Sequence, residues 1–247
     1  MVHEAATVGY SRDTLMYHRA RPTYHPELVK RVGERYSEGP VLELGAGTGI
    51  FTRQMIDQGM DVTAIEPVIS MRTMLSDAVP EADIRVGSAE KIPVGDHSFK
   101  TVVAAQSFHW FDGPKALQEI ERVLEPGGHL VTVWNVRDES NPWMADYTAV
   151  IDRYAGDTPR YRSMKWRQAI AKHTGFAPID EWRIANPQLT DVEGVVDRAV
   201  STSYIAALPD EQIVQVAAEI RRIALPHGPT IEFPYESQLQ SWRKISE

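Results

Sequence analysis

The chain has 247 residues, 43% of them hydrophobic, a size that suits one α/β domain with a smaller cap better than two independent domains. The chain has 26 Lys and Arg against 34 Asp and Glu, which gives a formal net charge of -8. A protein of this charge lacks the broad positive field that attracts nucleic acid. Cysteine is absent, which excludes disulfides and thiolate chemistry, and neither a membrane-spanning apolar run nor a signal-peptide pattern is found. We expect a cytoplasmic protein with no metal, membrane or nucleic-acid partner, and the sequence leaves its oligomeric state open.

The first half of the chain alternates short apolar runs with amphipathic segments. The predicted strands are residues 40–45, 61–66, 83–87, 99–108 and 129–135, and the predicted helices are residues 27–36, 48–58, 70–79 and about 114–124. This alternation predicts a parallel sheet with helices on both faces, because each right-handed crossover lies across the sheet. Ligands of such sheets bind beyond the carboxyl ends of the strands. The residues at or near these ends are Gly45, Glu66, Ser88, Gln106 and Asn135.

A glycine-rich loop, Gly45-Ala46-Gly47-Thr48-Gly49, follows the first predicted strand. Glycines let a ligand approach the backbone closely, and the helix that follows offers unpaired N–H groups. Glu66 ends the second strand, where a carboxylate can accept both hydroxyls of a ribose. Loop and acid together predict a nucleoside ligand, while the competing interpretation is a plain strand-to-helix turn beside a solvated acid. The third glycine of G-x-G-x-x-G is missing, which disfavours a dinucleotide.

At this point the sequence resembles the class I S-adenosylmethionine-dependent methyltransferases. The motifs are VLELGAGTG (residues 41–49), IEP (65–67), GSAEKIP (87–93) and VLEPGG (123–128), in the family's order. It is also similar to the small-molecule, trans-aconitate-methyltransferase-like branch (methyltransferase type 11) through YHRARPTYHP (17–26) and FHWFD (108–112). The resemblance implies a Rossmann-like sheet of seven strands, mostly parallel with the last one antiparallel, and S-adenosyl-L-methionine as the cofactor.

The resemblance also implies roles for individual positions. Gly45, Ala46 and Gly47 would line the methionine part of the cofactor, and Glu66, with Pro67 beside it, would bind the ribose. Ser88 and Ala89 would border the adenine, although many relatives carry Asp where this chain has Ser88. Gln106 would lie near the sulfonium, but a glutamine at a strand end can instead satisfy backbone groups.

Methyl transfer needs an aligned nucleophile and no water, and an acceptor that is not already ionised also needs a base. His109 follows the fourth strand and is the candidate base, although a histidine among aromatic residues can also be purely structural. Tyr17, Arg21 and Tyr24 belong to a segment of about residues 8–26 that could fold over the cofactor as a lid or simply pack against the sheet edge. We place Trp110 and Trp143 on the acceptor side.

The second half is expected to supply specificity. Cap elements are predicted at about 137–175 and 190–226, and the helical stretches are residues 143–154, 191–201 and 209–224. The basic aromatic stretch Arg160–Arg167 either recognises an anionic group or is a solvated helix with Trp166 turned inward. Residues 179–187 and 230–235 alternate like strands, and the resemblance implies that they are strands six and seven.

We therefore expect a single methyltransferase domain over residues 1–247, with a cofactor-binding core at about 27–135. The leading hypothesis is methyl transfer from S-adenosylmethionine to a small-molecule acceptor by in-line displacement. The alternatives are a nicotinamide-dependent oxidoreductase and a non-catalytic cofactor-binding protein on the same fold.

Overall fold

The computed structural model describes residues 14–245, so residues 8–13 of the expected lid lie outside the described part. The main helices are α2 (Thr14–Ala20), α3 (Pro26–Tyr36), α4 (Ile50–Asp57), α5 (Ile69–Ala78), α6 (Gly113–Val123), α7 (Pro142–Asp152), α8 (Lys165–Lys172), α9 (Val192–Val200), α10 (Ser203–Ala206) and α11 (Asp210–Ala224). The strands are β1 (Val41–Leu44), β2 (Val62–Ile65), β3 (Asp83–Arg85), β4 (Phe99–Ala105), β5 (Leu124–Arg137), β6 (Phe176–Ala185), β7 (Gln188–Thr190), β8 (Ile231–Phe233) and β9 (Tyr235–Lys244).

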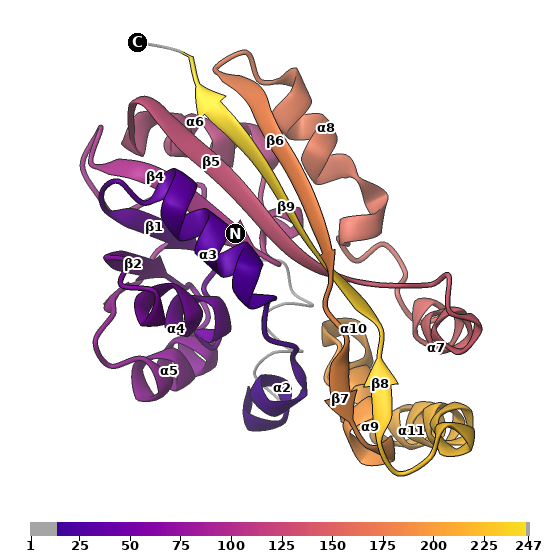
Figure 1. Cartoon of the computed structure of the whole chain (residues 1–247). Coiled ribbons are helices and arrows are strands. Elements are labelled where there is room, and N and C mark those ends of the chain that lie inside the picture. The colour runs from indigo at the N-terminus through magenta and orange to yellow at the C-terminus, as the bar shows by residue number, and fades with distance from the viewer. Residues whose placement is uncertain (1–13, 246–247) are drawn as a thin grey trace.

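Seven strands form one sheet in the order β3-β2-β1-β4-β5-β9-β6. β1 to β5 pair in parallel, whereas β9 is antiparallel to both of its neighbours, β5 and β6 (Figure 1). This confirms the predicted Rossmann-like α/β sheet, mostly parallel with the last strand antiparallel.

The prediction that residues 230–235 form the seventh strand of the main sheet was wrong. Residues 230–235 contribute β8, which pairs with β7 in a separate two-stranded sheet, and the seventh strand of the main sheet is β9. Pro234 separates β8 from β9 and has no N–H to donate to a ladder, so the two strands are not continuous. β9 was not predicted because it buries polar side chains. One of them, Gln240, accepts a hydrogen bond from Thr132 Oγ1 at 3.0 Å.

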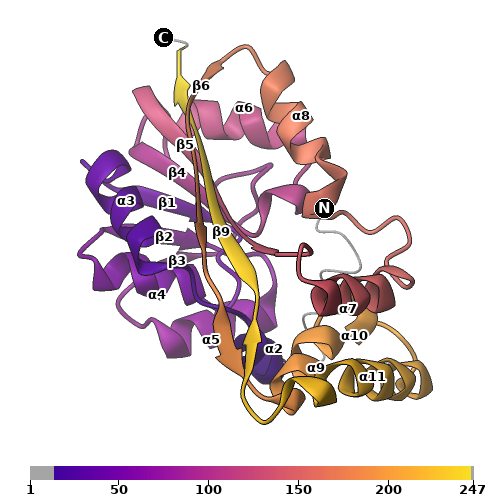
Figure 2. The ribbon, with the colours of Figure 1, turned by 45° about the vertical axis from the view of Figure 1, so that its right-hand side comes forward.

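The sheet is covered on both faces. Val41 of β1 packs with α3 and α4, while the next residue, Leu42, packs on the opposite face with α6 and α8. Alternation of this kind follows from the two-residue period of a strand, and β1 is buried on both sides. Figure 2 shows the sheet nearly edge-on, with α3 and α4 on one side and α6 and α8 on the other.

A helical cap lies at one end of the sheet (Figure 2). α7, α9, α10 and α11 pack with β8 around a hydrophobic cluster of their own, which includes Tyr147, Ile205 and Ile220, all fully buried. α8 falls within the expected cap stretch 137–175 but packs on α6 and the sheet instead. The cause is Trp166, whose ring lies 4.8 Å from that of the buried Trp134 on β5.

Buried amides tie the segment after α2 to the ends of three strands. The carbonyl of Thr23 accepts hydrogen bonds from Asn135 Nδ2 at 3.1 Å and Asn186 Nδ2 at 2.8 Å. Asn135 Oδ1 accepts in turn from Asn186 Nδ2 at 3.1 Å and from Ser237 Oγ at 2.5 Å. Each buried amide is thereby paired, and the N-terminal segment is fixed beside the carboxyl end of β5.

Over residues 14–245 the longest apolar helices are too short or too polar to cross a lipid bilayer.

Candidate cofactor and acceptor site

A cavity of about 290 Å³ lies beyond the carboxyl ends of β1, β2, β4 and β5, between the sheet and the cap. It is lined by almost every residue that the sequence singled out. These are Tyr17, Arg21, Tyr24, Gly45, Ala46, Gly47, Glu66, Pro67, Ser88, Ala89, Gln106, His109 and Trp110. The structure therefore brings the expected cofactor residues and the expected lid residues to one place.

The loop after β1 depends on glycine at two positions. Gly45 has φ +68°, and a Cβ there would lie 2.8 Å from Ser107 Cβ. Gly47 has φ +60°, and a Cβ there would meet nothing within 4 Å. The backbone at Gly47 is thus open on the side where a side chain would stand, which leaves room for a ligand to approach.

Glu66 is only 5% exposed, and both of its carboxylate oxygens are engaged. Oε2 accepts a hydrogen bond from Gly47 N and Oε1 accepts one from Val68 N, each at 2.8 Å. Burial raises the pKa of Glu66, and these two backbone donors partly oppose the rise. Each oxygen retains a further lone pair for a hydroxyl donor, and Glu66 lines the cavity.

Glu43 is a cavity residue that the sequence interpretation missed. It sits in the middle of β1, is 1% exposed, and accepts a hydrogen bond from Thr52 Oγ1 at 2.6 Å. Burial raises its pKa to about 8, with a smaller contribution from the charge of Glu66. The available signal was an acid inside the otherwise apolar run VLEL, since glutamate is almost never fully buried without a reason.

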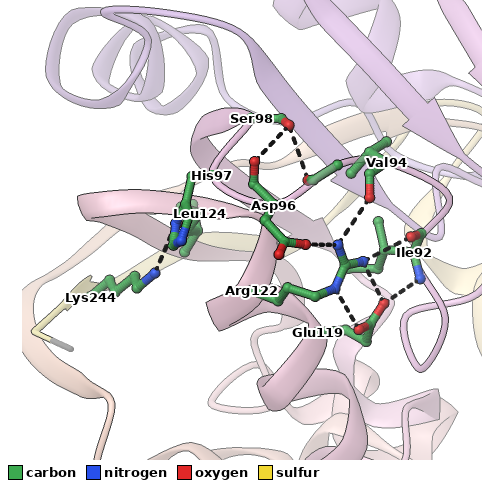
Figure 3. A network of polar contacts seen from close by, with 10 residues as sticks. Ile92, Val94, Asp96, His97, Ser98, Glu119, Arg122, Leu124 and Lys244 are labelled. Carbon is green, nitrogen blue, oxygen red and sulfur yellow. Dashed lines mark hydrogen bonds and ion pairs between the residues drawn. The ribbon is translucent and has the colours of Figure 1, made fainter. Parts of the chain in front are cut away.

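The loop that carries Ser88 and Ala89 continues to Ile92 and Val94, where two side chains of α6 form hydrogen bonds with its backbone (Figure 3). Glu119 accepts a hydrogen bond from Ile92 N at 2.8 Å, and Arg122 donates to the carbonyls of Ile92 and Val94 at 3.0 Å. Arg122 also pairs with Glu119 at 2.8 Å, so the two side chains form one clamp. The clamp fixes this loop, whose residues Ser88 and Ala89 line the cavity.

Gln106 uses its side chain on the backbone. Its Nε2 donates to the Asn135 carbonyl at 2.7 Å, and its φ of +55° is uncommon for a residue other than glycine. Of the two interpretations weighed for this residue, the structure supports the satisfaction of backbone groups, although Gln106 still lines the cavity.

His109 lies between two tryptophan rings, 4.9 Å from Trp110 and 5.6 Å from Trp134 by ring centroids. Its Nδ1 is buried with no hydrogen-bond partner among the described residues. Burial lowers the pKa of His109 to about 3. The imidazole is therefore neutral at pH 7 and a weak proton acceptor, a property that depends on burial in the folded protein.

The N-terminal segment contacts both the core and the cap. Arg21 donates to Ser201 Oγ at 3.1 Å and to the Ser201 carbonyl at 2.9 Å, at the end of α9. Its guanidinium also lies 4.0 Å from the centre of the Tyr17 ring. Tyr24 packs edge-on against Phe51 of α4 at 4.7 Å, so the segment contacts both α4 and the end of α9 and lines the cavity.

The acceptor side differs from expectation in two ways. Trp143 does not line the cavity, because it packs inside the cap at 5.6 Å from Phe233 and 5.0 Å from His227. In the basic stretch Trp166 is buried, as one interpretation expected, while Arg160 and Arg162 line the cavity but form ion pairs with Asp152 and Glu139. Among residues 14–245, no group of three histidine or carboxylate side chains is arranged to hold a metal ion.

Comparisons with known proteins agree with this geometry. Residues 42–132 match the family model described as a methyltransferase domain. An uncharacterized methyltransferase-like protein of Schizosaccharomyces pombe is 35% identical over 219 residues, which cover 87% of this chain and 85% of the relative. An uncharacterized methyltransferase of Mycobacterium bovis is 32% identical over 211 residues, with 85% and 83% covered.

The fold has solved counterparts as well. The structure of a putative type II methyltransferase from Anaeromyxobacter dehalogenans superposes with a TM-score of 0.61 at 21% identity, covering 91% of this chain and 98% of the other. Sequence relatives, fold and strand-end cavity agree, and the chain belongs to the class I S-adenosylmethionine-dependent methyltransferases.

Proposed function

We propose that the protein transfers a methyl group from S-adenosylmethionine to a small-molecule acceptor bound in the same cavity. The observation that carries the proposal is that residues of the sheet and residues of the cap line one and the same cavity. One cavity touches Gly47 and Glu66 at the strand ends and also Arg198 and Tyr204 in the cap. A cofactor on the sheet side and an acceptor on the cap side would share one enclosed space.

The residues fit the cofactor. The open backbone at Gly47 offers room for its methionine part, and the lone pairs of Glu66 are suited to ribose hydroxyls. Ser88 and Ala89 would border the adenine through a loop that α6 holds in place. Glu43, whose pKa burial raises to about 8, can ionise against a bound ammonium group.

When bound, S-adenosylmethionine would supply a methyl group carried on a positively charged sulfonium, and in-line transfer of that methyl group to the acceptor would leave a neutral thioether. The protein's part is to align the acceptor and exclude water. Tyr24, Trp110 and Phe111 supply apolar wall to the cavity for this purpose. His109, being neutral and weakly basic, is suited to orienting the acceptor rather than removing its proton. An acceptor that is already ionised at pH 7 therefore fits best.

Binding of S-adenosylmethionine, measured by titration calorimetry, tests the first half of the proposal. Glu66→Ala removes both acceptors offered to the ribose, and hydrogen bonds to a charged group contribute about 1.5–3 kcal/mol each, so the Kd should rise about 100-fold or more. Glu66→Gln keeps the shape and should lose less. The matched control is Glu232→Ala, an exposed glutamate of β8 outside the cavity lining, which should bind like the wild type.

Two results would contradict the proposal. The first is failure of the intact protein to bind S-adenosylmethionine. The second is tighter binding of NADH, which a spectral titration detects and which would favour the nicotinamide alternative. Normal binding with no methyl transfer to any of a broad set of acceptors would favour the non-catalytic alternative.

A further inference from the structure

Two buried ring nitrogens beside the cavity have no hydrogen-bond partner among the described residues. One is Nδ1 of His109, in the turn after β4, and the other is Nε1 of Trp134 on β5. The two rings are neighbours, with centroids 5.6 Å apart and planes tilted by 38°. A buried polar group without a partner costs about 1–3 kcal/mol, so two of them side by side call for an explanation.

The chemistry of the two nitrogens restricts what can satisfy them. An indole N–H only donates, whereas an imidazole nitrogen donates or accepts according to its tautomer. The two nitrogens do not bond to each other directly. One water molecule can link two nitrogens up to about 6 Å apart, since each hydrogen bond spans about 2.9 Å. Buried waters commonly satisfy polar groups of this kind, and the separation of the two rings suits such a bridge.

The neighbouring aromatic residues already use their polar groups elsewhere. Trp134 packs against Tyr161 at 5.0 Å and against Trp166 at 4.8 Å between ring centroids. The Tyr161 hydroxyl donates to Gln238 at 2.6 Å, and Trp166 Nε1 donates to the Tyr161 carbonyl at 3.1 Å. Trp134 and Trp166 therefore share one hydrophobic cluster, but only the indole N–H of Trp166 has a protein partner.

We propose that a buried water accepts a hydrogen bond from Trp134 Nε1 and donates one to His109 Nδ1, and so holds His109 in the tautomer with its proton on Nε2. A water that accepted from both nitrogens would bury two unpaired O–H groups, whereas this arrangement leaves at most one. Trp134 is thereby a positioning residue, because it acts on the cavity through the water and the imidazole.

The tautomer decides what His109 offers to a bound molecule. His109 is partly exposed and lines the cavity although its Nδ1 is buried, so the opposite edge of the ring, with Nε2, faces the cavity. A protonated Nε2 donates a hydrogen bond and cannot remove a proton. On the proposed function, on which this consequence rests, the acceptor presents a lone pair to His109 rather than a hydrogen.

Nitrogen NMR of the full-length protein tests the tautomer without cofactor or acceptor. In ¹⁵N-labelled protein at pH 7, long-range ¹H–¹⁵N correlations distinguish a protonated ring nitrogen from an unprotonated one. His109→Asn assigns the signals by their loss. We expect an unprotonated Nδ1 and a protonated Nε2, with no second tautomer. We also expect a rotating-frame Overhauser cross-peak between the Trp134 indole N–H and a bound water.

Two tryptophan variants assign the effect to the indole N–H. Trp134→Phe keeps an aromatic ring but removes the donor, so both tautomers of His109 should be populated and its two nitrogen signals should move toward each other. The matched control is Trp166→Phe, which removes an indole of the same cluster whose N–H donates to the Tyr161 carbonyl. His109 should keep the wild-type tautomer in this control.

The proposal is overturned if Nδ1 carries the proton in the wild type, or if the Trp134 indole N–H shows no contact with a bound water. It is also overturned if Trp134→Phe leaves the tautomer unchanged, or if Trp166→Phe changes it as much. The first two results come from the wild type and decide the question even if Trp134→Phe does not fold. Failure of the proposed function is a separate result, since it is measured by binding of S-adenosylmethionine.

Discussion

At the scale of single residues, Glu43 makes stability depend on pH. Its carboxyl group stays protonated in the fold up to about pH 8, whereas in the unfolded chain it ionises near its ordinary pKa of 4.5. The unfolded state therefore loses a proton that the folded state keeps, and stability falls as pH rises from 4.5 to 8. The loss is at most about 1.4 kcal/mol per pH unit, because one pKa unit corresponds to that free energy.

The glutamine of Glu43→Gln cannot titrate, so the stability of this variant relative to the wild type should increase as the pH rises from 5 to 8. Urea unfolding at several pH values measures this difference. Glu232→Gln, on the surface of β8, makes the same chemical change outside the cavity and is the matched control. A constant difference for Glu43→Gln would mean that Glu43 is ionised in the folded protein.

His109 yields a second residue-scale prediction, with the opposite sign. Its folded pKa of about 3 lies below the ordinary 6.5, so the unfolded chain takes up a proton first and stability is lost as pH falls below 6.5. In ¹⁵N-labelled protein, one imidazole should keep its neutral chemical shifts from pH 8 down to pH 5. The His109→Asn variant assigns these signals by their disappearance. A titration midpoint near 6.5 would restore His109 as a candidate base.

At the scale of elements, α6 supports the cofactor loop through Glu119 and Arg122 (Figure 3). Arg122→Gln removes the donors that hold the carbonyls of Ile92 and Val94, and we expect the Kd for S-adenosylmethionine to rise about five- to ten-fold, a loss of about 1 kcal/mol. Hydrogen exchange at Ile92 N–H should accelerate in parallel.

Asp96→Asn is the matched control for this clamp. Asp96 contacts the same guanidinium at 2.7 Å, but it is 66% exposed, and an exposed ion pair contributes little. Cofactor binding should therefore stay near the wild-type value. If Arg122→Gln also binds normally, the loop is held by the Ser88–Lys91 bridge and its own packing instead.

The elements differed in how far the sequence could predict them. Strands β1 and β4 are short, mainly apolar runs bounded by turn residues, and α6 has one apolar stripe, so both patterns could be recognised in the sequence. β9 was not predicted, because its buried positions carry serine and glutamine whose partners lie on other elements. Tyr161, for example, donates to Gln238 at 2.6 Å from a distant loop. Such pairing exists only in the folded chain.

At the scale of the whole molecule, the cofactor side of the site was predictable and the acceptor side was not. Gly45 and Glu66 could be placed together because the carboxyl ends of parallel strands meet at one edge. Arg137 and Arg198 come from segments far apart in the chain, and only the packing of the cap brings both into the lining of the cavity. The burial that makes His109 neutral is likewise a property of the assembled molecule.

The position of β9 between β5 and β6 has a consequence for synthesis on the ribosome. β6 is made long before β9, with which it pairs in the sheet, and most of the cap residues are made in between. Until β9 emerges, β5 remains an open edge whose unpaired N–H and C=O groups can pair with another chain. The sheet and the cap are thus completed together by a late, non-local step, and the nascent chain is most exposed to aggregation just before it.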